Sequence, residues 1–301
     1  MRVFVTGASG HIGSAVIPEL LTHGHQVVGL ARSDDAAAKV AKLGAEVRRG
    51  DLGDLEGLQA AASEADGVIH LAFDHEKLRI GQLAEAADGD KAAVQAYAEV
   101  LEGTGKPLVT TSGVLMLALS GVTGRPGTEE DAVANVPRAA TEALTISLAE
   151  RGVRSSVVRL APMVHSDLDK NGFTRALIGY ARENGFAAYV GDGANRWSGA
   201  NSYDVGALYR LAVEKAPAGT RLHGVEDSGI AFKTVAETIA AQLGIEARSV
   251  TKEEAPQYLG FLTHFADLDA PVSNDITRKV LGWEPSHAGW VEDVRAGHYF
   301  A

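Results

Sequence analysis

The fold is decided by Arg2-Val3-Phe4-Val5-Thr6-Gly7-Ala8-Ser9-Gly10-His11-Ile12-Gly13. A β-branched apolar run breaks into three glycines spaced three residues apart, and an apolar-periodic helix resumes at Ser14-Ala15-Val16-Ile17. This order of strand, glycines and helix places bare backbone N–H groups at a helix N-terminus, where a pyrophosphate approaches without meeting a Cβ. The stretch therefore predicts a dinucleotide-binding turn rather than an ordinary strand-to-helix connection.

The rest of the chain continues the alternation of strands and helices. Strand-like runs lie at residues 3–6, 26–31, 46–49, 67–71, 107–111 and 155–159, and alanine-rich helical stretches separate them. This alternation predicts an α/β fold with a doubly wound parallel Rossmann sheet. After about residue 162 the rhythm changes to Gly and Asp loops with helices around 204–215 and 233–243, which indicates a smaller C-terminal substrate lobe. We expect a dinucleotide-binding domain of residues 1–165 and 199–223, and a substrate-binding lobe of residues 166–198 and 224–301.

Composition excludes several classes of protein. With 46% hydrophobic residues the chain can bury a large core, and it contains neither a long apolar run nor a leader segment, so we expect a cytoplasmic location and no membrane partner. The absence of cysteine excludes disulfides and thiol catalysis. A formal charge of −11 without a basic run argues against nucleic acid. The ten histidines lack helical ligand spacing, so no metal site is expected.

The spacing Gly7-x-x-Gly10-x-x-Gly13 resembles that of the short-chain dehydrogenase/reductase superfamily, in particular its extended branch, the NAD-dependent epimerase/dehydratase-like family. The resemblance implies that Gly7 makes the turn, Gly10 admits the phosphates, and Gly13 packs the helix against the strand. It also places Ser9, His11 and Ile12 at the cofactor. Near the C-terminus, Leu281-Gly282-Trp283-Glu284-Pro285 is similar to the closing turn of that family, so the resemblance extends to about residue 290.

The end of the second strand indicates which cofactor is bound. NAD-binding sheets carry an acidic residue there for the ribose hydroxyls, whereas this chain has Arg32 and Ser33. A guanidinium pairs with a 2′-phosphate that a carboxylate would repel, so NADP(H) is the expected cofactor. A second interpretation stays open, in which Arg32 pairs with Asp34 or Asp35 at the surface.

The resemblance adds further cofactor contacts after the other strands. Asp51 and Leu52 match the pair at the adenine edge, and His70-Leu71-Ala72-Phe73 resembles the H-L-A-A stretch of extended members, whose backbone runs against the cofactor. His70 itself is interpreted as a core histidine. The exit of the sixth strand is similar to the segment that lies along the nicotinamide. These matches imply cofactor contacts by Leu71, Ala72, Phe73, Thr111, Pro162 and Val164.

The expected catalytic residues depart from the superfamily pattern. Ser112 ends the fifth strand at the position of the serine that donates a hydrogen bond to the substrate carbonyl. The superfamily's Tyr-x-x-x-Lys is absent, because alignment puts Ala134 at the tyrosine and Arg138 at the lysine. The segment resembles an atypical subgroup with Pro-Arg-x-x-x-Glu. Arg138 would then hold the nicotinamide ribose, although a guanidinium is a poor proton donor. Alternatively, the helix only packs and Arg138 makes a surface pair.

Another group must therefore supply the proton. There are three candidates. They are a water molecule bound at Ser112, the hydroxyl of Tyr203, and His165, which the resemblance places near the chemistry. We expect Asp204 to cap the helix around 204–215. The leading hypothesis is an NADP(H)-dependent oxidoreductase that reduces a small ketone or aldehyde, or oxidises the alcohol. The alternatives are an NADP(H)-binding sensor without turnover and a nucleotide-sugar epimerase or dehydratase. Small residues on the helix of about 136–150 suggest a homodimer.

Overall fold

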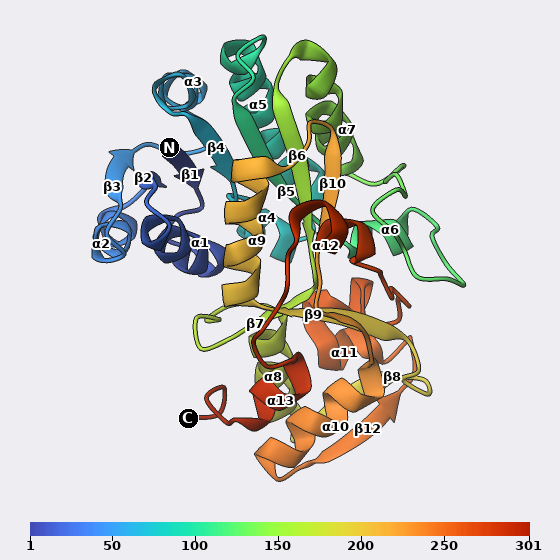
Figure 1. Cartoon of the computed structure of the whole chain (residues 1–301). Coiled ribbons are helices and arrows are strands. Elements are labelled where there is room, and N and C mark those ends of the chain that lie inside the picture. Colours follow the sequence, from blue (N-terminus) through green and yellow to red (C-terminus); the bar gives the residue numbers. More distant parts are fainter.

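The computed structural model describes residues 1–301 and shows a large α/β domain joined to a smaller lobe (Figure 1). The large domain contains a seven-stranded sheet in the order β10-β6-β5-β4-β1-β2-β3, and all of its pairings are parallel. The predicted α/β class with a doubly wound sheet is confirmed. Its strands are β1 (Arg2–Thr6), β2 (Gln26–Ala31), β3 (Glu46–Arg49), β4 (Gly67–His70), β5 (Pro107–Gly113), β6 (Arg154–Leu160) and β10 (Thr220–Gly224).

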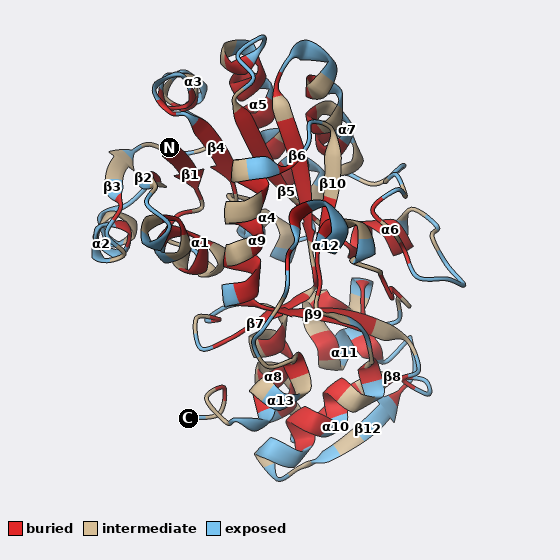
Figure 2. Ribbon diagram, in the orientation of Figure 1, coloured by how far each residue is buried: buried red, intermediate tan, exposed pale blue.

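Helices cover both faces of this sheet, and buried residues concentrate on the strands and on the inward helix faces (Figure 2). One face carries α1 (His11–Thr22), α2 (Asp34–Lys42) and α9 (Ser202–Lys215), whose apolar residues join those of the strands in one core. The other face carries α3 (Leu55–Glu64), α5 (Leu83–Leu101), α7 (Ala139–Ser147) and the short 3-10 helix η1 (Leu148–Arg151), which enclose a second core. Coverage of both faces explains why the central strands are apolar nearly throughout.

The smaller lobe has its own core, which includes Trp197 and Trp290. It contains the three-stranded sheet β11-β9-β7 and the parallel pair β12-β8. The strands are β7 (Met163–His165), β8 (Phe186–Val190), β9 (Arg196–Asn201), β11 (Asp227–Ala231) and β12 (Glu246–Val250). The helices of this part of the molecule are α8 (Phe173–Asn184), α10 (Phe232–Leu243), α11 (Ala255–Leu259), η2 (Gly260–His264) and α13 (Trp290–Arg295).

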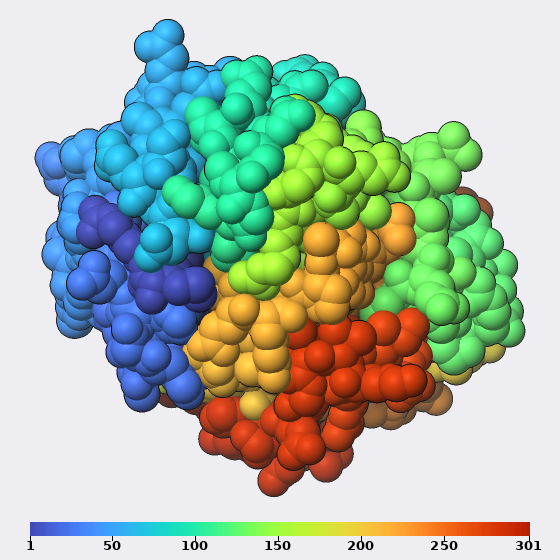
Figure 3. Space-filling view, turned by 45° about the horizontal axis from the view of Figure 1, so that its top comes forward, coloured from blue at the N-terminus to red at the C-terminus, as the bar shows by residue number.

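Three short helices complete the chain. They are α4 (His75–Arg79) after β4, α6 (Leu115–Leu119) after β5, and α12 (Asp275–Leu281), whose Leu281 joins the core of the large sheet. The space-filling view shows residues near the C-terminus, in red, beside the gold and orange residues that include α9 (Figure 3). Trp283 fixes this contact, because its indole N–H donates to the carbonyl of Asp204 at 2.8 Å. None of the helices is both long and apolar enough to span a bilayer.

The structure corrects three local predictions. The sheet has a seventh strand, β10, that the strand-like runs did not include. The helix expected from about residue 136 begins only at Ala139, because Asn135 has a positive φ of 58° and Pro137 follows it. Asp204 does not cap α9, since the Asn201 side chain accepts from the Tyr203 N–H instead. The Asp204 carboxylate accepts from the backbone N–H groups of Ser286 and His287, both at 3.0 Å.

Candidate functional site

A cleft of about 1040 Å³ runs along the carboxyl ends of the parallel strands and continues to the smaller lobe. This is where open α/β sheets bind their ligands. Most of the residues that the sequence analysis selected line it together: Gly7, Ser9, Gly10, His11, Ile12, Arg32, Asp51, Leu52, Leu71, Ala72, Phe73, Thr111, Ser112, Arg138, Pro162 and Val164. Gly13, Ser33 and His165 do not line it.

The glycine turn between β1 and α1 has no room for side chains at two of its positions. Gly7 has a φ of +64°, and a Cβ there would meet the backbone N of Ala72 at 2.9 Å. A Cβ on Gly13 would lie 2.5 Å from the carbonyl oxygens of Gly7 and Ala8. No side chain caps α1, whose N-cap residue is Gly10. The first N–H groups of this helix are therefore available to an anion in the cleft, which is the chemistry that a dinucleotide diphosphate needs.

The far end of the cleft carries positive charge. Arg32 lines the cleft and makes no ion pair, because Asp34 instead binds Arg49 at 2.6 Å. Lys39 of α2 lines the same end, a position that the sequence analysis missed. Ser33 has a local structural role, since its hydroxyl accepts from the backbone N–H of Ala36 and caps α2. Two cations without a carboxylate partner fit a phosphate group.

Ser112 lies near the end of β5, where the strand meets the cleft. Its side chain is 5% exposed and its hydroxyl makes no hydrogen bond. The neighbouring Thr111 differs, because its hydroxyl bonds to the carbonyl of His70 at 2.8 Å and to the hydroxyl of Tyr209 at 2.7 Å. Ser112 therefore has a free donor and acceptor, whereas Thr111 offers the cleft mainly its backbone.

Arg138 is held in the cleft by three contacts. Its Nη2 donates to the carbonyl oxygen of Thr111 at 2.5 Å and lies 3.3 Å from the carboxylate of Asp90. Its guanidinium carbon lies 4.2 Å from the ring centroid of Phe73. Arg138 is thus oriented by a buried acid and not by a surface partner, while its Nε has no partner.

Asp90 also connects Arg138 to the glycine turn. Its other oxygen lies 3.3 Å from Nε2 of His70, and Nδ1 of His70 is hydrogen-bonded to the hydroxyl of Thr6 at 2.8 Å. Asp90 and His70 are 2% and 1% exposed, so this chain of contacts is closed to solvent. Burial opposes ionisation, but the charge of Arg138 and the His70 contact hold the pKa of Asp90 below its usual value. His70 is therefore a buried polar connector behind the site.

Irregular backbone precedes α7, where the resemblance predicted the first turn of the helix that carries Tyr-x-x-x-Lys. Ala134 lies in irregular backbone, where its N–H donates to the hydroxyl of Ser120 at 3.0 Å, and Arg138 is the N-cap residue of α7. The glutamate of Pro-Arg-x-x-x-Glu has a structural role. Glu142 is ion-paired with the fully buried Arg159 of β6 and with Arg221 of β10, the latter at 3.0 Å.

Two proposed proton donors lie away from the cleft. His165 is fully buried on β7, its Nδ1 lies 2.8 Å from the carboxylate of Asp293, and its Nε2 has no partner. The Tyr203 hydroxyl donates to Asp167 at 2.9 Å, and burial together with that carboxylate raises the pKa of Tyr203 to about 12. This geometry gives neither group direct access to a substrate in the cleft.

The structure adds residues to the site that no sequence motif indicated. His75, at the start of α4, lines the cleft with its ring centroid 5.5 Å from that of Phe73. Phe173, Phe261 and Phe265 reach the cleft from the smaller lobe. The position of His75 directly after the loop that ends β4 could have indicated a site residue. The three phenylalanines occur in segments without a recognisable sequence pattern.

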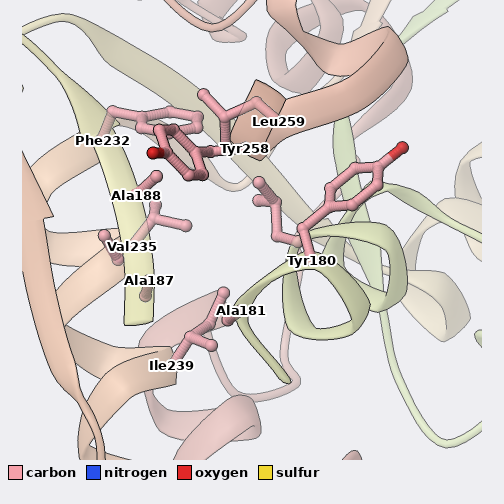
Figure 4. A pocket seen from close by; sticks show the side chains of 11 residues that line it. Tyr180, Ala181, Ala187, Ala188, Phe232, Val235, Ile239, Tyr258 and Leu259 are labelled. Carbon is pink, nitrogen blue, oxygen red and sulfur yellow. The ribbon is translucent and has the colours of Figure 1, made fainter. Parts of the chain in front are cut away.

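A second pocket lies inside the smaller lobe, between α8, β8, α10 and α11 (Figure 4). Its eleven lining residues are all hydrophobic, and they include Tyr180, Phe232 and Tyr258. Its volume of about 10 Å³ is no larger than one water molecule needs, so it is a packing gap of the lobe core. No group of three or more His, Asp or Glu side chains is arranged to hold a metal ion.

Comparison with known proteins places this site in a family. Residues 1–99 match the model of the NmrA-like family. Uncharacterized proteins of Saccharomyces cerevisiae and Schizosaccharomyces pombe are 43% and 41% identical to this chain, and the alignments cover 99% and 100% of both partners. A 3-diazoavenalumate denitrifying reductase of a Streptomyces species is 29% identical, with 96% of this chain and 98% of the relative covered.

Solved structures share the fold at lower identity. A dTDP-glucose 4,6-dehydratase from Streptomyces venezuelae, with NAD bound, has a TM-score of 0.75 at 19% identity and covers 99% of this chain and 96% of its own. MoeE5, in complex with UDP-glucose and NAD, has a TM-score of 0.76 at 21% identity and covers 99% and 97%. The chain therefore belongs to one family with the two fungal proteins.

Proposed function

We propose that the protein is an NADP(H)-dependent carbonyl reductase, which reduces a ketone or aldehyde of a small organic molecule or oxidises the corresponding alcohol. The observation that carries this proposal is the unpartnered hydroxyl of Ser112. Ser112 lines the cleft that the glycine turn and Arg138 also line. The Streptomyces relative is named a denitrifying reductase, which supports a reductase but says nothing of a carbonyl substrate.

The residues of the cleft fit the parts of the cofactor. The uncapped N-terminus of α1, at Gly10, would hold the diphosphate, and Arg32 with Lys39 would hold the 2′-phosphate. Asp51 would accept from the adenine amine, and Arg138 would hold the nicotinamide ribose. When bound, the reduced nicotinamide supplies a hydride.

Ser112 would act on the substrate carbonyl. Its O–H donates to the carbonyl oxygen and polarises the bond, and the same hydrogen bond becomes stronger as negative charge develops on that oxygen. The guanidinium of Arg138 adds positive charge nearby, but it keeps its proton throughout. The resulting alkoxide must therefore take a proton from His75, the cleft histidine beside Phe73, or from water.

The experiment measures NADPH oxidation with a panel of aldehydes and ketones. Ser112→Ala should lower the rate by about a hundredfold to a thousandfold, the usual cost of a lost oxyanion donor, while the Kd for NADPH stays within about threefold. Ser156→Ala is the matched control, because Ser156 is also buried with an unpartnered hydroxyl but lies outside the cleft. Equal rates for Ser112→Ala and the parent would refute the proposed role.

His75→Gln separates the two proton sources. Burial, followed by the charges of Arg138 and Arg79, lowers the pKa of His75 from its usual value near 6.5. A general acid must be protonated, so a rate that depends on His75 falls as the pH rises through this lowered pKa. A flattened pH profile in the variant assigns the proton to the imidazole, and an unchanged profile assigns it to water.

The missing tyrosine favours a second candidate, an NADP(H) sensor. A chain that binds NADPH but oxidises none of it with any carbonyl of the panel would support the sensor and contradict the reductase. Conversion of a nucleotide sugar without net oxidation of the cofactor would instead indicate an epimerase or dehydratase.

A further inference from the structure

The part of the cleft next to Ser112 has an apolar wall made by two parts of the molecule. Leu115 and Met116 come from α6, directly after β5, while Leu168, Phe173, Phe261 and Phe265 come from the side of the smaller lobe. We refer to these six residues as the apolar wall. None of their side chains carries an N–H or O–H group, so this surface offers a substrate only dispersion and hydrophobic contact.

The three phenylalanines of the wall support one another. The ring of Phe173 stacks on that of Phe265, with centroids 6.1 Å apart and an interplanar angle of 27°. It also meets Phe261 edge to face, at 5.7 Å and 72°. Its centroid also lies 5.9 Å from that of Trp197, which is fully buried. Because these rings are already fixed, they lose little conformational entropy when a flat aromatic ring of a ligand binds against them.

A sugar would be poorly matched to this wall. Each buried hydroxyl without a hydrogen-bond partner carries a desolvation cost, and the wall has no partners to give. Two exposed cations of the cleft, Arg79 and Lys170, are already bonded to backbone. Arg79 donates to the carbonyl of Asn171 at 3.3 Å, and Lys170 to that of Asp167 at 2.8 Å.

We infer that the substrate is an aromatic carbonyl compound, an aryl aldehyde or aryl ketone, whose ring lies against Phe173 and Phe261 while its oxygen reaches Ser112. The inference rests on the proposed carbonyl reduction and names its substrate class. The cleft contains both the hydroxyl-bearing Ser112 and the apolar wall, as a molecule with one carbonyl and one ring requires.

Two measurements test this inference. The first is the binding of benzamide to the NADPH-loaded protein by calorimetry, because benzamide keeps a ring and a carbonyl oxygen but does not accept a hydride. Cyclohexanecarboxamide is the comparison, since it is similar in size and apolar without being aromatic. We expect benzamide to bind at least threefold more tightly. The second is the KM for benzaldehyde and for acetaldehyde in Phe173→Leu and Phe261→Leu.

Each leucine variant keeps an apolar side chain and removes only the ring. We expect the KM for benzaldehyde to rise about threefold to tenfold, as the loss of an aromatic pair predicts, and to rise more than the KM for acetaldehyde. Phe186→Leu is the control, because Phe186 is a buried ring of the same lobe that does not line the cleft.

The outcomes separate the inference from the proposed function. Tighter binding of cyclohexanecarboxamide, or a rise in the benzaldehyde KM no larger in Phe173→Leu than in Phe186→Leu, overturns the inference even when carbonyl reduction is observed. A protein that binds benzamide preferentially through Phe173 but oxidises no NADPH confirms the aromatic site and overturns the reductase.

Discussion

Asp90→Asn tests whether the buried carboxylate of Asp90 stabilises the folded position of Arg138. Asp90 contacts Nη2 of Arg138 and Nε2 of His70, both at 3.3 Å, and is 2% exposed. Breaking a buried ion pair costs about 3–5 kcal/mol of folding free energy when the remaining charge has no other partner. Arg138 would keep its hydrogen bond to Thr111 and its contact with Phe73, and the asparagine would remain a polar neighbour. We therefore expect a loss of about 2–3 kcal/mol.

The assay is thermal unfolding, in which this loss corresponds to a fall in Tm of about 3–5 °C for a chain of this length. Asp88→Asn is the control, because Asp88 lies on the same helix but is exposed, and its change should stay within about 0.5 kcal/mol. A double-mutant cycle with Arg138→Gln should give a coupling energy of about 1 kcal/mol or more between the two positions. Additive single effects, or equal Tm values for Asp90→Asn and Asp88→Asn, would refute the reasoning.

The pH dependence gives a second measure of the same contact. The pKa of Asp90 lies below its usual value in the folded protein, so the carboxylate contributes stability above the unfolded pKa of about 3.9. That contribution is lost as the pH falls through the lowered folded value. The difference in Tm between the parent and Asp90→Asn should therefore be complete at pH 7 and shrink below about pH 4. A difference that grows at acidic pH would contradict the assignment.

Four further predictions address the rest of the chain. Arg32→Ala should lower the ratio of NADPH to NADH efficiency by about tenfold to a hundredfold, and an unchanged ratio would exclude the 2′-phosphate contact. Gly13→Ala should cost about 1–3 kcal/mol in thermal unfolding, because its Cβ would lie 2.5 Å from two carbonyl oxygens. Glu142→Gln should lower stability by about 3–5 kcal/mol, since it leaves the buried Arg159 without a carboxylate. Light scattering should give twice the chain mass of 31.5 kDa if the exposed Ala140, Ala143 and Ser147 of α7 form a dimer contact.

The sequence predicted the elements whose signals are local. Strand β1 is apolar because helices cover both of its faces. Gly13 is required by the carbonyl oxygens of Gly7 and Ala8 in the same turn, whereas the close contact at Gly7 is with the backbone of Ala72 after β4. Strand β10 was missed because Thr-Arg-Leu-His-Gly contains one aliphatic residue and lies at the edge of the sheet. Its pairing with β6 depends on a register set by the whole domain, so a local sequence pattern does not predict this pairing.

Side-chain roles that depend on distant partners were harder to predict. His165 follows a proline at the end of the sixth strand, as a catalytic residue would, but its partner is Asp293 in α13. Asp204 stands where a capping residue belongs, but it binds the backbone at residues 286 and 287. In both cases the actual partner is about 80 residues or more away in sequence. It can therefore be predicted only from a structure that shows where the C-terminal segment packs.

The absent tyrosine is a change of backbone and not only of one side chain. In a helix, residues 134 and 138 would lie on one face, one turn apart. Here Asn135 adopts a left-handed conformation, Pro137 lacks an N–H, and α7 begins one residue after Arg138. A tyrosine at position 134 would therefore not be held over Arg138 by helical geometry. The structure instead holds Arg138 through Asp90 and leaves the hydroxyl of Ser112 unpartnered, and under the proposed function these two side chains would act at the substrate carbonyl and the cofactor ribose.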